Sequence, residues 1–108
     1  MKKLIIATFA LALSLTSNAQ EKGKNTIEVK GNCEMCKKRI EKAALTVKGV
    51  RSIDWSADKQ SMDLFINTKK TSVLEVEKAI AKAGHDTANV KATKEDYDNL
   101  HSCCQYER

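Results

Sequence analysis

The apolar side chains of this chain follow two periodicities. Three short stretches alternate between apolar and polar residues, a pattern typical of half-buried strands: residues 26–30, 50–57 and 62–67. Two longer stretches carry apolar residues at spacings of three and four, which predicts helices over residues 34–48 and 72–83. Strands and helices are therefore interleaved along the chain.

Boundary residues support this division. Gly49 and Gly84 stand where the two helices should end, and Ser72-x-x-Glu75 is a capping box at the start of the second. A weaker fourth strand is predicted over residues 85–91. The element order predicts a ferredoxin-like βαββαβ sandwich of the α+β class, in which two helices cover one face of a four-stranded antiparallel sheet.

The two ends of the chain differ from this central part. Residues 1–19 combine two lysines, an apolar run and a small-residue cleavage pattern, which predicts a secretory signal peptide. Residues 20–25 read as a flexible lead-in, residues 26–91 as the domain, and residues 92–108 as an extension with a short helix of its own, capped at Thr93. We expect a soluble periplasmic or secreted protein after cleavage.

Charge excludes one class of partner. Removal of residues 1–19 lowers the formal net charge from +5 to +3. The remaining lysines are interspersed with carboxylates along both helices, as on solvated helix faces, and form no basic stripe. We therefore expect no nucleic-acid partner. A processed chain of roughly 90 residues provides one small core and no second domain.

The main candidate site is Cys33-x-x-Cys36, at the junction of the first strand and the first helix. Two thiolates at this spacing suit a soft ion such as Cu(I), Hg(II) or Zn(II), and they leave its other sides open for transfer to a partner. Free N–H groups at the helix start, together with the positive charges of residues 37–39, should lower the thiol pKa values.

Cysteine spacing leaves alternatives open. Cys103 and Cys104 bring the count to four, and in an exported protein these residues allow three disulfide pairings, so a disulfide-stabilised structural module is one alternative. A periplasmic thiol-disulfide protein is another, because Cys-x-x-Cys at a helix start is also a redox motif. The chain has no proline, which argues against this enzyme class, where proline stands in or beside the motif.

Together, three features resemble the heavy-metal-associated domain family, which includes copper chaperones and periplasmic mercury-binding proteins. They are Cys33-x-x-Cys36, the Gly49-Val50 junction, and Ala83-Gly84-His85-Asp86 before the fourth strand. The resemblance implies a carrier and not an enzyme. Where the family usually has a buried Met two residues before the first cysteine, this chain has Gly31, and its tail has no counterpart in the minimal domain.

Further ligands are predicted from the topology. The second helix should end beside the thiols, which makes His85 a candidate third ligand or a nearby titrating charge. The tail that carries Cys103, Cys104 and His101 begins at the far end of the predicted fourth strand. A helix and a short extended segment are just long enough to cover the distance of roughly 20 Å back to the Cys-x-x-Cys loop. If they join, the site suits tetrahedral Zn(II), a Cu(I) cluster or a metal-bridged homodimer.

The sequence thus predicts an exported soft-metal-binding protein that carries or sequesters an ion for transport or detoxification. The partner would be a membrane metal transporter or another metal-binding domain.

Overall fold

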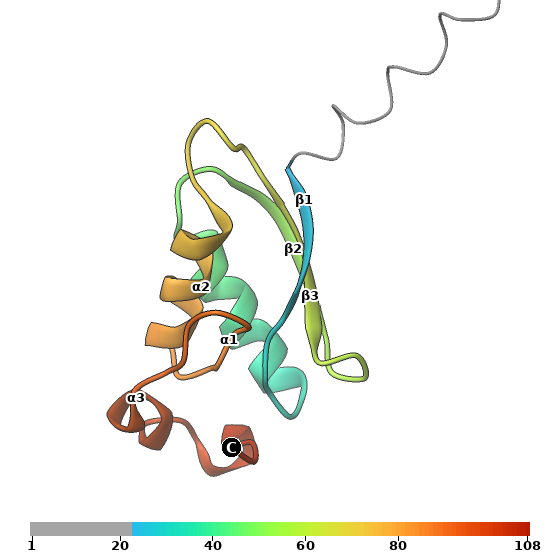
Figure 1. The fold of residues 1–108 in the computed structure, drawn as a ribbon. Helices are drawn as coiled ribbons and strands as arrows, with labels where there is room; N and C mark the ends of the chain where they lie inside the picture. The colour runs from blue at the N-terminus through green and yellow to red at the C-terminus, as the bar shows by residue number, and fades with distance from the viewer. Residues whose placement is uncertain (1–22) are drawn as a thin grey trace, which may run out of the picture.

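A small antiparallel sheet and two helices on one of its faces form the body of the protein (Figure 1). The computed structural model describes residues 23–108, so the signal peptide predicted for residues 1–19 lies outside the described part. Within that part, no helix is long and apolar enough to cross a membrane. The elements are β1 (Lys24–Glu28), α1 (Glu34–Leu45), β2 (Val50–Ser56), β3 (Ser61–Ile66), α2 (Val73–Lys82), α3 (Lys94–Asp98) and a 3-10 helix, η3 (Ser102–Cys104).

The sheet has the order β1-β3-β2, with β3 antiparallel to both neighbours. Ile27 on β1 lies opposite Met62, and Ile53 on β2 lies opposite Leu64. The predicted alternation is confirmed on β3, where Met62, Leu64 and Ile66 are buried while Asp63 and Phe65 are exposed. The buried side chains meet the helices, as the ferredoxin-like α+β plan requires.

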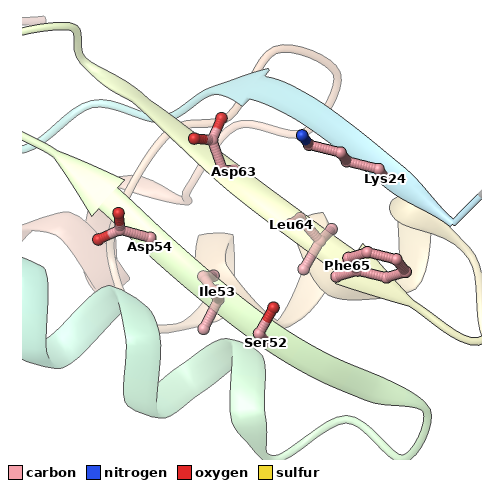
Figure 2. A pocket seen from close by; sticks show the side chains of 7 residues that line it. All are labelled: Lys24, Ser52, Ile53, Asp54, Asp63, Leu64 and Phe65. Carbon is pink, nitrogen blue, oxygen red and sulfur yellow. The ribbon is translucent and has the colours of Figure 1, made fainter. Parts of the chain in front are cut away.

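The other face of the sheet is open. A hollow of about 250 Å³ lies over β2 and β3, and the side chains of Lys24, Asp63 and Phe65 line part of it (Figure 2). No cysteine or histidine lines this hollow. The face is therefore separate from the predicted metal site.

Helix ends follow the predicted capping residues at α2 and differ at α1. Ser72 Oγ accepts a hydrogen bond of 3.3 Å from the Glu75 N–H, and Gly84 follows α2 with a φ of +110°. Helix α1 ends at Leu45, one turn before the predicted end, because the chain turns at Thr46 and reaches Gly49, with φ +104°, outside the helix. Both glycines adopt a backbone that other residues rarely adopt.

The predicted fourth strand is reduced to one bridge, so the described sheet has three strands and not four. Thr87 pairs with Val29, and the chain then turns away, because Thr87 bonds Val90 through both its backbone and its hydroxyl. The fully buried Glu77 of α2 holds this turn by accepting from the Asn89 backbone N–H at 3.0 Å and from its amide at 3.1 Å. Local hydrogen bonds have replaced a strand ladder here.

This early turn changes where the tail begins. Asp86 O accepts from the Lys30 N–H at 2.9 Å, and Asp86 Oδ1 accepts from the Ala92 N–H at 2.7 Å. The extension therefore starts beside the loop that precedes Cys33, at the same end of the sheet. The predicted return of roughly 20 Å is not needed, because the strand that would have carried the chain away is absent.

Candidate metal centre

Cys33 and Cys36 are placed by the first turn of α1. Cys33 is the N-cap, with an extended backbone and a side chain that does not cap the helix, and Cys36 lies one turn later. Their sulfurs are 3.8 Å apart, far beyond the length of a disulfide, and all four cysteines are free. The Cys36 sulfur accepts from the Asn32 N–H at 3.3 Å. Neither sulfur is part of a disulfide.

Backbone N–H groups at the helix start lower the pKa of the Cys33 thiol. The N–H of Cys36 contributes most, and the N–H of Met35 adds to it. The predicted help from Lys37 is wrong, because its ammonium bonds Asp54 at 2.6 Å and Glu41 at 2.8 Å, and these acids raise its own pKa. The thiolate is therefore favoured by the helix start and not by this lysine.

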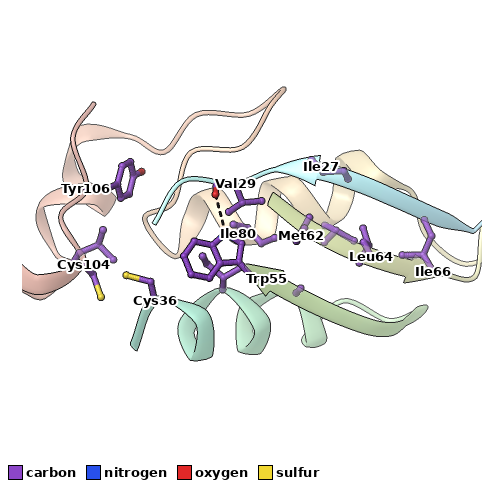
Figure 3. Packing of buried hydrophobic residues seen from close by; sticks show 14 residues of the cluster. Ile27, Val29, Cys36, Trp55, Met62, Leu64, Ile66, Ile80, Cys104 and Tyr106 are labelled. Carbon is purple, nitrogen blue, oxygen red and sulfur yellow. Dashed lines mark hydrogen bonds between the residues drawn. The ribbon is translucent and has the colours of Figure 1, made fainter. Parts of the chain in front are cut away.

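A tryptophan takes the space under the loop. The Trp55 side chain is 2% exposed, and its indole N–H donates to Val29 O at 2.9 Å (Figure 3). A Cβ on Gly31 would lie 2.9 Å from the Trp55 ring and 3.2 Å from Cys36 Cβ. Glycine is needed here because the ring fills the volume that a side chain would occupy. The Trp55 ring therefore supports the loop from below at the position of Gly31.

The tail brings two more thiols to this loop. The Sγ atoms of Cys33, Cys103 and Cys104 lie within 4.8 Å of one another. Cys104 is fully buried. Burial is the main cause that raises the pKa of the Cys104 thiol, and the contact with the Cys36 sulfur raises it further. Figure 3 shows Cys36 at the start of α1 beside Cys104 of the tail. Four sulfurs from two distant segments thus converge at one end of the fold.

The site is less open than the sequence predicts. Cys36 is fully buried, whereas Cys33 is half-buried and Cys103 exposed. The prediction that the two thiolates leave the other sides of the ion open is therefore wrong on the Cys36 side, because Cys104 packs against Cys36. An ion in this site would be reached through Cys33 and Cys103.

The two histidines lie outside the thiol group. His85 is fully buried; its Nδ1 lies 2.8 Å from Lys30 O, and its ring stacks on Tyr106 with centroids 5.6 Å apart. His85 Nε2 has no hydrogen-bond partner among the described residues. His101 is exposed, and its backbone carbonyl accepts from the Cys104 N–H at 2.8 Å. Their roles as ligands stay predictions.

Burial lowers the pKa of His85 below its ordinary value near 6.5, so this side chain stays neutral in the folded protein where an unfolded chain would bind a proton. Unfolding then takes up a proton below that pH, and we expect the metal-free protein to lose stability as pH falls below about 6.5. Urea denaturation at pH 5.5 and 7.5 measures this. His85→Gln should flatten the difference and His101→Gln should not. An equal profile in all three proteins would contradict the assignment.

Two further residues contact the tail and were not predicted. Asn32 Nδ2 donates to Cys103 O at 3.3 Å, and the Met35 Sδ atom lies 3.7 Å from Cys103 Sγ. Both residues lie in or beside the Cys-x-x-Cys motif, which was the only signal in the sequence. Met35 is 51% exposed and adds a soft thioether at the rim of the sulfur group.

Comparison with known proteins agrees with this geometry. The family model described as the heavy-metal-associated domain matches residues 26–86. No curated protein matches the chain. Among solved structures, a CopZ metallochaperone is 26% identical with a TM-score of 0.58, covering 60% of this chain and 98% of its own. The oxidized MerP from Ralstonia metallidurans CH34 is also 26% identical, with a TM-score of 0.53, covering 60% of this chain and 94% of its own.

A copper binding domain from HMA7, a P-type ATPase, has the same fold at 22% identity, with a TM-score of 0.57, covering 59% of this chain and 88% of its own. The residues matched by the family model include the Cys-x-x-Cys loop, both long helices and strands β2 and β3. Because the family model matches more than half of this chain, the chain belongs to the heavy-metal-associated domain family.

Proposed function

We propose that this protein is an exported carrier or store for a soft metal ion, held by Cys33 and Cys36 together with Cys103 and Cys104. The observation that carries this proposal is the convergence of tail and loop thiols, three of whose sulfurs lie within 4.8 Å of one another. Thiolates are the donors that Cu(I), Hg(II) and Zn(II) prefer. Export follows from the predicted signal peptide at residues 1–19.

Sulfur spacing supports binding without a large rearrangement. A Zn–S bond of about 2.3 Å in a tetrahedron places neighbouring sulfurs about 3.8 Å apart. The Cys33 and Cys36 sulfurs are already at 3.8 Å. The sulfurs of Cys33, Cys103 and Cys104 lie within 4.8 Å of one another, so each of these pairs needs to close by about an ångström or less to reach the same spacing. Because all four thiols come from one chain, this arrangement favours a monomer over a metal-bridged dimer.

Burial on one side and exposure on the other favour slow, directed exchange of the ion. Cys36 and Cys104 are shielded from incoming thiols, whereas Cys33 and Cys103 are accessible. A partner would attack at the exposed pair and replace the ligands one at a time. The relatives include a domain of a P-type ATPase, so a membrane metal transporter is the partner we propose.

The tail thiols are tested by competition for the ion. We expect the reduced protein to hold Zn(II) or Cu(I) against a colorimetric chelator at least tenfold more tightly than Cys103→Ser/Cys104→Ser, since two ligands are lost. Ser102→Ala is the matched control in the same turn and should bind like the parent. Equal affinities for the parent and the double variant would contradict a ligand role for the tail.

A further inference from the structure

The tail is anchored on both sides of its two cysteines. Before them, Leu100 is 4% exposed and packs so closely on Gly84 that a Cβ there would lie 2.8 Å from the Leu100 side chain. After them, Tyr106 is 3% exposed, and its hydroxyl donates to Gly84 O at 2.8 Å and accepts from the Asp86 N–H at 2.8 Å. Cys103 and Cys104 therefore lie in a short span that is fixed at each end.

Asp86 connects the tail to the metal loop. Its carboxylate accepts two bonds from the Arg108 guanidinium, at 2.9 and 3.0 Å, and one from the Ala92 N–H at 2.7 Å. Its backbone carbonyl accepts from the Lys30 N–H. One residue thus joins the segment between β1 and the cysteine loop, the start of the extension and the end of the tail.

The ion pair is better shielded than a surface pair. The Asp86 side chain is 8% exposed and that of Arg108 is 28% exposed. Arg108 also donates to Ala92 O at 2.7 Å and lies over the Tyr97 ring, 4.8 Å from its centroid. Bidentate, partly buried pairs of this kind are costly to break by removing one partner. The contacts consequently favour a closed tail even when no ion is bound.

We propose that Asp86, Arg108 and Tyr106 form a latch that holds the tail thiols over the Cys-x-x-Cys loop and thereby sets how fast the ion is released. This inference rests on the proposed function, because it requires Cys103 and Cys104 to bind the ion. None of the three latch residues touches the ion, so they are positioning residues. The latch and the ion favour the same closed tail, and each stabilises the other.

A consequence is that a partner can begin exchange at the exposed thiols but must open the latch to complete it. With the tail closed, Cys36 and Cys104 are buried. Exchange at Cys33 and Cys103 alone removes only part of the ligand set. Release is complete only when the segment between Leu100 and Tyr106 lifts away from α1.

The test is a double-mutant cycle on the metal-loaded protein. Zn(II) is the probe, and its transfer to an excess of a coloured chelator is followed by stopped flow. We expect Asp86→Asn and Arg108→Gln each to speed release by about tenfold or more. In a Cys103→Ser/Cys104→Ser background, the same substitutions should leave the release rate unchanged. Asp98→Asn, which breaks the exposed Lys94 pair in the same extension, is the matched control.

Each outcome has a separate meaning. Faster release from Asp86→Asn and Arg108→Gln only when the tail thiols are present supports the latch. Unchanged release from both variants, with faster release from the tail-thiol variant, overturns the latch and leaves the proposed function standing. Equal acceleration in both backgrounds overturns it as well, because the effect would then be on the fold. Arg108→Gln is the variant less expected to disturb the fold, because it leaves the hydrogen bond between Asp86 and Ala92 intact.

Discussion

Replacement of Cys33 or Cys36 by Ser is expected to weaken binding of Cu(I), Hg(II) and Zn(II) by more than about a hundredfold. Substitutions of residues that merely support a metal ligand typically cost 10- to 100-fold in affinity, and the loss of a ligand costs more. A hydroxyl is a hard, protonated group that does not replace a soft thiolate. Because the same helix turn places both residues, the two Ser variants should lose metal affinity by similar factors.

Competition titration of the reduced protein measures this affinity. Cys33 is half-buried, so Cys33→Ser should leave the metal-free fold unchanged, and circular dichroism provides the control. Cys36 is fully buried, and its Ser variant should also lose some stability, because the hydroxyl would need a buried partner. An affinity within threefold of the parent for either variant would contradict the carrier proposal.

Trp55→Ala is expected to lower the free energy of unfolding by about 3–5 kcal/mol, the range for large buried aromatic residues. The ring is 2% exposed, supports the Gly31 loop and donates to Val29 O. Its removal leaves a cavity under the metal loop and an unpaired carbonyl on the adjacent strand segment. In a domain of this size, such a loss is a large part of the total stability.

Urea denaturation of the reduced, metal-free protein tests this expectation. Phe65→Ala is the matched control, because Phe65 is a 39% exposed aromatic on the open face of the sheet, and its loss should cost much less. Trp55→Phe should fall between the two, since it keeps most of the volume but loses the hydrogen bond. A Trp55→Ala cost no greater than that of Phe65→Ala would contradict the support role.

Much of the fold could be predicted because local signals and tertiary packing agree. The alternation of Met62, Leu64 and Ile66 predicted a strand with one buried face, and the capping box at Ser72 predicted the start of α2. Thr93 likewise caps α3 by accepting from the Asp96 N–H at 3.0 Å. In these segments the residue pattern and the fold require the same conformation.

The loss of the predicted fourth strand does not follow from the sequence, because it depends on contacts with residues distant along the chain. Val90 has strand propensity, but the contact between Glu77 and Asn89 ties the segment into a turn. Glu77 looks like a solvated helix residue in the sequence and is fully buried in the fold. In this segment, tertiary hydrogen bonds override the strand propensity of the residues around Val90.

Predictions about the site succeed or fail for a similar reason. The Cys-x-x-Cys loop is a local motif, and its position at the start of α1 follows from sequence alone. Asp54, one acid partner of Lys37, lies on β2, and the latch joins Asp86 to the end of the tail, so neither contact follows from spacing. Chain length alone allows Cys103 to approach Cys33, but the observed path is shorter than the predicted one.

X-ray absorption of the Zn(II)-loaded protein tests the central claim most directly, because it counts the sulfurs bound to the ion. The claim is that loop and tail thiols share one ion, and it predicts three or four sulfur ligands in the parent protein. In Cys103→Ser/Cys104→Ser the count should fall to two, with lighter atoms replacing the missing sulfurs. Two sulfurs in both proteins would contradict the claim.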